Sequence, residues 1–356
     1  MSINGGQAID CDIHPALAST DVLLPYLDDY WREMVPNRMV ADLTLASYPP
    51  AVPLSGRPDW RPKNGKPGTD FAMLQSQALD GFGTRFAICN VVHGAPAMVN
   101  DDFAAALCRG INDWLVAEWL DRDPRLRASI VVPTENPEMA VEEIERRASD
   151  KRFVQVLVLA QGERPLGRRT YWPIYAAAER HGLPIGIHAG SAGRHATTSI
   201  GWPSFFIEDY VANSQAFAGQ LLSFVTEGVF ERFPGLKVVL IESGFTWLPP
   251  FLWRFDKTWR GIRTEVPWVK QPPSELIREH VRLTLQPVDE PPTAQQLQRV
   301  VEHLESDDML LFSSDYPHWQ FDGEDALPAA LDPALRRKIM VDNPLSTYIR
   351  LEESAS

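Results

Sequence analysis

Ionisable residues interrupt the first apolar run of the sequence, residues 8–13, and continue just beyond it. Asp10, Asp12 and His14 alternate there with apolar residues. Successive side chains of a β-strand point to opposite faces, so these three residues share one face. Burying two carboxylates and an imidazole is costly unless they are paired or coordinate a metal. The run therefore predicts a strand whose polar face is either a hydrogen-bonded network or part of a metal site.

Ionisable residues also follow three later apolar runs. His188 follows the fifth run, Glu242 follows the sixth, and Asp315 comes soon after the eighth. Imidazole nitrogens and carboxylate oxygens suit zinc, manganese or iron(II), whereas magnesium prefers more oxygen ligands and water. We therefore expect one divalent metal ion, with zinc as the first choice and manganese or iron as alternatives. Its expected ligands are Asp12, His14, His188 and Asp315.

The elements that must position these residues alternate along the chain. Eight short apolar runs have strand character: residues 8–13, 85–92, 127–132, 153–159, 184–187, 237–241, 281–285 and 309–313. Helical patterns lie between them, at residues 101–120, 137–149, 173–181, 208–227, 247–263 and 293–304. Eight such units predict a parallel sheet closed into a (β/α)8 TIM barrel, whose active site lies at the C-terminal strand ends.

One gap between the predicted strands is longer than a single helix needs. We expect residues 1–356 to form one barrel domain, with residues 19–80 as an insertion or flap after the first strand. This segment contains a predicted helix over residues 21–32 and then a Pro-rich stretch over residues 48–67. Loops of such length are usually functional or disordered. The mixture of prolines with apolar and aromatic residues favours an ordered flap, and a surface excursion without a role is the alternative.

Composition and charge exclude several classes of function. The formal charge of −13 disfavours a sequence-independent nucleic-acid binder and an anionic membrane surface as partners. Three cysteines, Cys11, Cys89 and Cys108, are too few and too scattered for a disulfide framework or a thiolate zinc site. The first residues show no export signal and no apolar run approaches membrane-spanning length, so we expect a cytoplasmic protein.

The motif order resembles the amidohydrolase superfamily, within it the branch of aminocarboxymuconate-semialdehyde, resorcylate and carboxyvanillate decarboxylases. The resemblance implies a barrel with one catalytic metal ion, in which Asp315 is both a ligand and the proton carrier. Two positions depart from the family pattern: Asp12 stands where His is more common, and Glu242 stands where the sixth strand usually ends in His. Residues 153–161 contain no Lys, which disfavours the carboxylated Lys of two-metal members.

A bound divalent metal ion generates hydroxide near neutral pH. Hydrolysis is the commoner reaction of the superfamily, and the missing His after the sixth strand harms it no more than decarboxylation. We expect hydrolysis of an amide, lactone or related carbonyl bond in a small, anionic or aromatic substrate, with Asp315 accepting the proton from the water. Glu242 or His318 would supply the second proton function. The alternative is non-oxidative decarboxylation of an aromatic or unsaturated acid. A third possibility is a binding protein that has lost catalysis.

Several residues are candidates for contact with the substrate. Arg254 lies near the place where the family carries a carboxylate-binding arginine, although a surface salt bridge is the alternative. His93 follows the second predicted strand and is expected to reach the pocket, and Trp247 and Trp319 are expected to form its walls. Five tryptophans follow strand ends: Trp60, Trp202, Trp247, Trp253 and Trp319. The resemblance also implies a homodimer acting on a small molecule.

Overall fold

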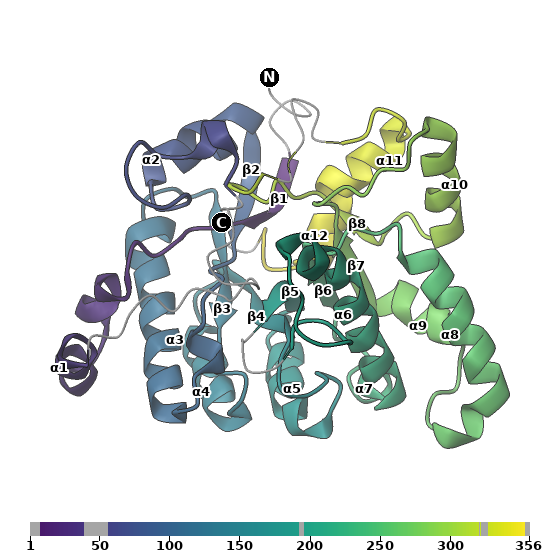
Figure 1. Ribbon diagram of the computed structural model, residues 1–356, viewed down its shortest axis with the longest axis horizontal. Helices are drawn as coiled ribbons and strands as arrows, with labels where there is room; N and C mark the ends of the chain where they lie inside the picture. The colour runs from purple at the N-terminus through teal and green to yellow at the C-terminus, as the bar shows by residue number, and fades with distance from the viewer. Residues whose placement is uncertain (1–7, 39–55, 192–195, 320, 322–326, 353–356) are drawn as a thin grey trace.

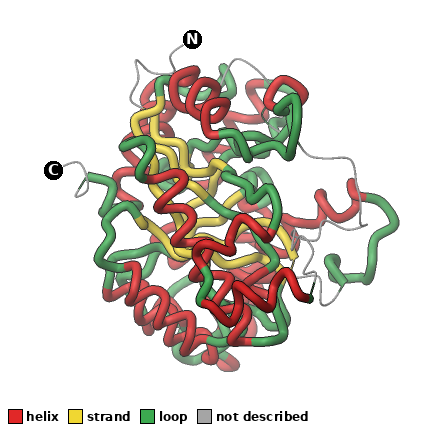
Figure 2. The backbone as a smooth tube through the Cα atoms, turned by 90° about the vertical axis from the view of Figure 1, so that its left-hand side faces the viewer, coloured by secondary structure: helices red, strands yellow, loops and turns green. Residues whose placement is uncertain are grey.

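Eight parallel strands form a (β/α)8 barrel with helices around its outside (Figures 1 and 2). The computed structural model describes residues 8–38, 56–191, 196–319, 321 and 327–352. The strands neighbour one another in chain order, which confirms the predicted barrel. They are β1 Ala8–Ile13, β2 Thr84–Cys89, β3 Leu126–Val131, β4 Phe153–Gln161, β5 Ile185–Ser191, β6 Val238–Ile241, β7 Val281–Thr284 and β8 Leu310–Leu311.

Backbone hydrogen bonds close the barrel between its last and first strands. The Cys11 N–H donates to the Phe312 carbonyl oxygen at 3.0 Å, and the His14 N–H donates to the Tyr316 carbonyl oxygen at 2.7 Å. The Asp315 N–H donates to the Asp12 carbonyl oxygen at 3.1 Å. The chain beyond the short strand β8 therefore lies beside the end of β1, which brings two of the expected site residues together.

The helices that flank the strands begin at the caps that the sequence provides. Side chains of Asn100, Asn136 and Thr293 accept backbone N–H groups at the first turns of α3, α4 and α10, which offsets unpaired donors there. The α-helices are α1 Asp29–Asn37, α2 Phe71–Leu74, α3 Asp101–Leu115, α4 Pro137–Arg147, α5 Trp172–Arg180, α6 Phe206–Thr226, α7 Val229–Arg232, α8 Leu248–Ile262, α9 Pro273–His280, α10 Ala294–Leu304, α11 Pro333–Arg337 and α12 Asn343–Thr347.

Short 3-10 and π-helices extend or connect these elements. The 3-10 helices are η2 Thr20–Tyr26, η3 Pro58–Trp60, η5 Ala95–Ala97, η7 Arg169–Tyr171 and η8 Arg263–Glu265. The π-helices are η4 Gln75–Asp80, η6 Val116–Leu120 and η9 Lys338–Asp342. Within the described residues, no helix combines the length and the apolar character needed to cross a bilayer.

The segment between β1 and β2 differs from the sequence prediction in one helix. Residues 21–32 form no single helix: η2 ends at Tyr26, and α1 begins at Asp29 after the Asp28 side chain accepts the Trp31 N–H. Pro25 lies near the end of η2, and its missing N–H and fixed φ disfavour a continuous α-helix there. Residues 39–55 of the predicted flap lie outside the described part of the chain.

Described parts of the same segment dock beside the chain that follows β8. The Arg57 N–H donates to the Pro317 carbonyl oxygen at 2.9 Å, and the Trp60 ring lies 4.8 Å from the Tyr316 ring. On the β1 side, the Ala16 N–H donates to the Gly68 carbonyl oxygen at 2.9 Å. The segment is therefore attached to the chain just after β1 and just after β8, close to the first and last expected site residues.

The predicted strand boundaries differ most at the C-terminal edge of the sheet, where β2 ends at Cys89 instead of residue 92 and β4 continues to Gln161 instead of residue 159. β5 continues to Ser191, so His188 lies within the strand and pairs with Ile241, where the sequence suggested a strand end. β8 is limited to Leu310 and Leu311, because only these residues and their partners on β7 keep regular pairing. Polar residues at this edge break the apolar pattern that the sequence analysis used.

Candidate metal centre

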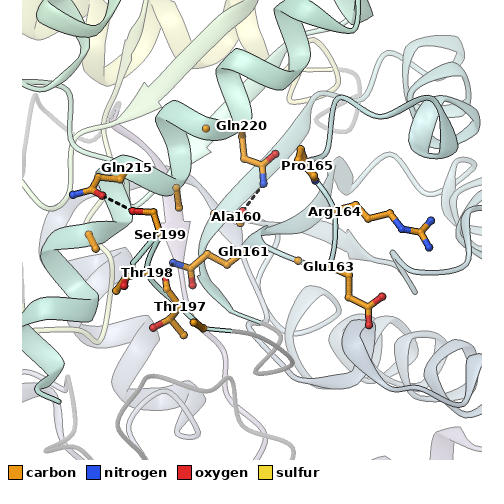
Figure 3. A pocket seen from close by; sticks show the side chains of 15 residues that line it. Ala160, Gln161, Glu163, Arg164, Pro165, Thr197, Thr198, Ser199, Gln215 and Gln220 are labelled. Carbon is orange, nitrogen blue, oxygen red and sulfur yellow. Dashed lines mark hydrogen bonds between the residues drawn. The ribbon is translucent and has the colours of Figure 1, made fainter. Parts of the chain in front are cut away.

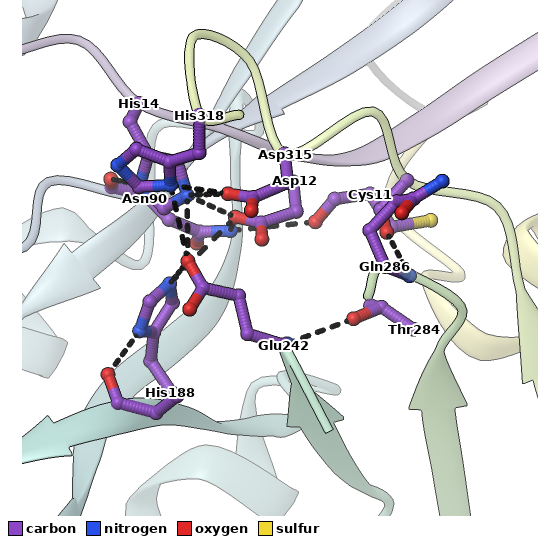
Figure 4. Close-up of polar contacts among 12 residues, drawn as sticks. Cys11, Asp12, His14, Asn90, His188, Glu242, Thr284, Gln286, Asp315 and His318 are labelled. Atoms are coloured by element: carbon purple, nitrogen blue, oxygen red, sulfur yellow. Dashed lines mark hydrogen bonds and ion pairs between the residues drawn. The ribbon is translucent and has the colours of Figure 1, made fainter. Parts of the chain in front are cut away.

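β1 and the residue that follows it contribute two side chains to a buried cluster inside the C-terminal end of the barrel (Figure 4). Asp12 is fully buried and His14 is 5% exposed. The His14 Nδ1 atom lies 3.0 Å from the Asn90 carbonyl oxygen, so this nitrogen is the donor and the Nε2 lone pair is left for another partner. Nε2 of His14 lies 3.2 Å from Oδ1 of Asp12 and 3.0 Å from Oδ1 of Asp315.

His188 faces the same cluster from β5. Its Nδ1 atom lies 2.6 Å from the Ala189 carbonyl oxygen, which again assigns the donor role to Nδ1. Its Nε2 atom lies 3.3 Å from Oε1 of Glu242 and 4.0 Å from Oδ1 of Asp12. The rings of His14 and His188 are nearly perpendicular, with centroids 5.1 Å apart. Both imidazoles thus direct their Nε2 atoms toward the same carboxylates.

Glu242 and Asp315 enter the cluster from backbone conformations that side chains rarely adopt. Their φ angles are 58° and 55°, in the left-handed region. Glu242 is held there by its N–H, which donates to Oγ1 of Thr284 at 2.9 Å. Strained backbone that is held in place by such bonds is common at functional sites. These turns explain how residues after short strands place carboxylates inside the barrel.

His318 completes the cluster from the loop after β8. Its Nδ1 atom lies 2.5 Å from Oδ1 of Asp315 and 3.3 Å from Oε1 of Glu242. Its ring lies 4.5 Å from that of His14. The sequence analysis grouped His318 with Asp315 and Glu242, and the structure brings all three together.

The donor atoms of the cluster fit a metal ion. Two overlapping groups, Asp12–His14–His188–Glu242 and His14–Glu242–Asp315–His318, each offer ligand atoms within 4.8 Å of one another. Apart from contacts within the cluster, five of its buried atoms have no hydrogen-bond partner among the described residues: Asp12 Oδ2, His14 Nε2, His188 Nε2, Glu242 Oε1 and Asp315 Oδ2. Unpaired buried donors and acceptors are costly, and a bound cation would satisfy these atoms together.

The protonation of the cluster shows how the protein balances these charges by itself. Burial lowers the pKa of His14, but Asp12 and hydrogen bonds to Asp315 and Glu242 raise this pKa well above its usual value. Burial raises the pKa of Glu242, yet the neighbouring histidines, His188 first, hold it well below its usual range. Glu242 is therefore a carboxylate, which suits a ligand better than the proton donor that the sequence suggested.

Asp315 and His318 have pKa values that differ from those of ordinary carboxyl and imidazole groups. Burial, and then the charge of Glu242, raise the pKa of Asp315 to about 6. Burial lowers the pKa of His318, but the adjacent Asp315 raises it to about 9. A carboxyl group with a pKa near neutrality suits general acid–base chemistry, as expected for Asp315 from the sequence.

Buried polar residues below the cluster were missed by the sequence analysis. Asn90, Ser129 and Gln155 are fully buried on neighbouring strands or just beyond them. The Asn90 Nδ2 group donates to Oδ1 of Asp12 at 2.8 Å. The alternation rule used for β1 would have found Ser129 and Gln155, which interrupt apolar strands in the same manner.

The expected substrate-contacting residues are more scattered. His93 is 8% exposed, and its Nδ1 atom accepts the Ala95 N–H at 3.1 Å. Trp247 is half-buried and donates to the Ser243 carbonyl oxygen at 2.9 Å, directly after Glu242. Trp319 is 46% exposed beside His318, with its ring 6.1 Å from Tyr210.

Arg254 and two of the tryptophans do not join the buried cluster. Arg254 is exposed on the outer helix α8, so its expected role in substrate binding gains no support from its position. Trp253 is also exposed on α8 and packs against His303 of α10, and Trp60 is buried in an aromatic contact with Tyr316. Trp253 on α8 thus gives no support to a pocket wall formed by the tryptophans that follow strand ends, and a role of Trp60 in such a wall stays a prediction.

A separate cavity of about 290 Å³ lies between α6 and the loops after β4 and β5 (Figure 3). It shares no lining residue with the cluster. Its glutamines are engaged: Gln161 Nε2 donates to the Thr197 carbonyl oxygen at 2.6 Å, and Gln220 Nε2 donates to the Ala160 carbonyl oxygen at 2.5 Å. The buried cluster is therefore the stronger candidate for chemistry.

Comparison with known proteins identifies relatives. A family model described as Amidohydrolase matches residues 9–349. Gamma-resorcylate decarboxylase of Rhodococcus jostii (strain RHA1) is 28% identical over 223 residues, which cover 56% of this chain and 67% of that protein. The enzyme of the same name from Polaromonas sp. (strain JS666 / ATCC BAA-500) is 26% identical over 217 residues, which cover 56% and 66%. The chain thus matches about two thirds of the length of these curated relatives.

Solved structures share the fold over nearly the whole chain. A 2,6-dihydroxybenzoate decarboxylase complexed with 2,6-dihydroxybenzoate has a TM-score of 0.68 at 19% identity, covering 98% of this chain and 100% of its own. A dihydroxybenzoic acid decarboxylase of Polaromonas sp. JS666 with manganese and 2-nitroresorcinol has a TM-score of 0.67 at 20% identity, covering 98% and 97%. A 5-carboxyvanillate decarboxylase mutant of Novosphingobium aromaticivorans DSM 12444 with manganese has a TM-score of 0.69 at 19% identity, covering 98% and 100%.

These relatives overturn the expectation that the protein hydrolyses an amide, lactone or related carbonyl bond. The sequence relatives named above are decarboxylases. Hydrolysis was expected because it is the commoner reaction of the superfamily. That reason concerns how often the reaction occurs among its members and does not come from the residues of this site. One set of metal ligands serves both reactions, so the ligands alone do not decide between them.

Proposed function

The chain belongs to the amidohydrolase family, and we propose that it is a metal-dependent, non-oxidative decarboxylase of an aromatic carboxylic acid. The observation that carries this proposal is the cluster of unpaired buried nitrogen and oxygen atoms beside the Asp315–His318 pair. The sequence relationship to gamma-resorcylate decarboxylases supports the reaction type. Hydroxylated benzoic acids are the first substrate class to test.

We propose Asp12, His14, His188 and Asp315 as metal ligands, with Glu242 as an additional carboxylate. Manganese becomes the first choice in place of zinc, because two related structures hold manganese and carboxylate ligands suit it. A bound divalent ion would hold an anionic oxygen of the substrate and stabilise the charge that develops near it. Each of these five residues has a buried nitrogen or oxygen atom without a hydrogen-bond partner outside the cluster, which supports this set.

Asp315 is proposed as the proton donor to the ring carbon. The carbon–carbon bond to the carboxylate breaks, carbon dioxide leaves, and the electron pair forms a carbon–hydrogen bond with the proton from Asp315. Solvent then returns a proton to Asp315. His318, 2.5 Å from Oδ1 of Asp315, is placed to hold this carboxylate while it changes charge.

The test is carbon dioxide release from a panel of hydroxybenzoates by the manganese-loaded protein. Reaction in D₂O should place one deuterium on the ring carbon that carried the carboxylate. The matched control is Asp308→Asn, which changes an exposed aspartate that pairs with Lys338 ahead of β8 and outside the cluster. A folded, metal-loaded protein that releases no carbon dioxide from any acid of the panel would refute the proposal.

We also propose that two copies associate through the outer face of α6. Exposed large apolar side chains concentrate on this helix and the loop before it: Ile200, Trp202, Phe205, Ile207, Val211 and Leu222. Residues 211–226 carry no charge, although the chain carries −13. A second copy of an acidic chain docks best where like charges are absent.

Light scattering tests this interface. The wild type should have the mass of a dimer, Val211→Lys should reduce that mass, and Ile262→Lys on α8 should leave it unchanged. A monomeric wild type would contradict the proposal.

The described insertion segments are proposed to cover one side of the metal centre. Gly68 contacts the backbone of His14, and Gly56 pairs in a bridge with His318. Both contacts reach residues of the cluster from residues 19–80. The insertion and the barrel would then act as one functional unit.

A further inference from the structure

Asn90 contacts Asp12 on β1 and His14 just beyond it, two residues of the metal centre. Its Nδ2 group donates to Oδ1 of Asp12 at 2.8 Å, and its carbonyl oxygen accepts from Nδ1 of His14 at 3.0 Å. The Asn90 N–H also donates to the Ile13 carbonyl oxygen at 2.8 Å. One fully buried residue therefore fixes the orientation of a carboxylate and of an imidazole.

Hydrogen bonds across the barrel interior hold the Asn90 amide in turn. Its Oδ1 atom accepts from Oγ of Ser129 at 2.5 Å and from Nε2 of Gln155 at 3.1 Å. Gln155 Nε2 also donates to Oγ of Ser129 at 2.8 Å. The Tyr348 hydroxyl donates to Oε1 of Gln155 at 3.3 Å. The network thus links β4, β3 and the end of β2 to Asp12 on β1.

The donors in this network all point the same way. Tyr348 donates to Gln155, Gln155 and Ser129 donate to Asn90, and Asn90 donates to Asp12. The Asn90 Nδ2 group also donates to the Cys11 carbonyl oxygen at 3.3 Å, so its amide is held on β1 and fixes the position of Oδ1 of Asp12. The Oδ2 atom of Asp12 has no partner among the described residues, so it is the oxygen left for a metal.

Packing from β5 restricts the far end of the same network. A Cβ atom placed on Gly186 would lie 2.8 Å from Oε1 of Gln155, closer than real Cβ contacts come. Gly186 lies two residues before His188 on β5. The absence of a side chain there leaves Gln155 the room it needs to reach both Asn90 and Ser129.

We propose that Asn90, supported by Ser129 and Gln155, is a positioning residue that sets the metal affinity of Asp12 and His14. This inference rests on the metal centre of the proposed function. Residues that orient metal ligands commonly change metal affinity by about 10- to 100-fold when they are replaced. The network reaches the cluster through the buried interior of the barrel.

The test measures the manganese dissociation constant by competition with a fluorescent chelator. Asn90→Leu, similar in size but without the amide, should weaken manganese binding by about 10- to 100-fold. Gln155→Met should weaken it less, because Asn90 keeps its bond to Asp12. Asn112→Leu is the matched control: Asn112 is also fully buried, but its amide bonds Val131 and Glu143 between α3, β3 and α4.

Thermal unfolding of the metal-free proteins separates loss of fold from loss of affinity. Asn112→Leu should lower the melting temperature and leave the dissociation constant unchanged. Unchanged manganese affinity in Asn90→Leu would overturn the inference; if that variant does not fold, unchanged affinity in Gln155→Met does so. Wild-type protein that binds no manganese would instead refute the metal in the proposed function, which keeps the two failures distinct.

Discussion

The Nδ1 atom of His318 lies 2.5 Å from Oδ1 of Asp315, and both residues follow the shortest strand of the barrel. Asp315 holds its carboxylate in the cluster through a left-handed backbone turn. His318 reaches back over one turn of chain, where the Gly56 bridge from the insertion meets it. The pair therefore joins the proposed metal centre to the segment that covers it.

Asp315→Asn should abolish carbon dioxide release. The amide neither donates a carboxylic proton nor carries the charge that balances His318, and a general acid typically contributes about 10²- to 10⁴-fold to a rate. The rate is measured by loss of substrate absorbance in manganese-saturated protein. Circular dichroism and melting should stay close to wild type. A variant whose rate stays within about 3-fold of wild type, against the expected loss of about 10²- to 10⁴-fold, would remove Asp315 from the proton step.

Removal of the metal should inactivate the protein and lower its melting temperature. The buried carboxylates and imidazoles of the cluster lose a shared partner, and a ligand present at about 100 times its dissociation constant stabilises the fold by about 2.7 kcal/mol. Treatment with a chelator, gel filtration and addition of manganese or zinc should restore activity to different extents. Full activity after complete removal, checked by elemental analysis, contradicts a metal-dependent reaction.

His280 should make the protein less stable in acid. Burial, opposed by a hydrogen bond to the Leu236 carbonyl oxygen, lowers the pKa of His280 below its usual value of 6.5, and its ring stacks on Phe230. The neutral form is thus favoured in the fold, so stability is greatest above pH 6.5, falls as the pH drops from 6.5 toward the lowered pKa, and falls no further below it.

Replacement of His280 tests this directly. His280→Gln should flatten the fall in urea midpoint between about pH 7 and 5, whereas His303→Gln on the exposed side of α10 should keep it. Equal acid sensitivity in wild type and His280→Gln would assign the effect to other groups.

Gly68→Ala should weaken the docking of the insertion. Its φ of 80° disfavours a side chain, and a Cβ there would lie 2.3 Å from the His14 carbonyl oxygen. The left-handed conformation alone costs about 1–2 kcal/mol, and the contact adds to it. Gly65→Ala is the control, since its φ is 92° but its nearest neighbour would lie 3.5 Å away.

The readouts for this pair are urea unfolding and the Michaelis constant for the best substrate. Gly68→Ala should lose more stability than Gly65→Ala and bind the substrate more weakly, because the insertion borders His14. If the two variants lose equal stability and have equal Michaelis constants, the close approach of Gly68 to His14 has no effect beyond the backbone strain that both substitutions introduce.

The sequence alone determined the architecture and the members of the cluster. Strand alternation on β1 places Asp12 and His14 on one face, and parallel strands bring their C-terminal ends to one edge, so His188, Glu242 and Asp315 had to meet there. These rules depend only on the local periodicity of the chain, so they can be applied without knowledge of the packing.

Only the tertiary structure decided what each member does. The charge state of Glu242 depends on three imidazoles that come from other strands, and the role of Asn90 depends on partners on β1, β3 and β4. The positions of Trp60 and Trp253 followed from the docking of the insertion and of α8. Such contacts join residues far apart in the chain, and no spacing in the sequence encodes their distances.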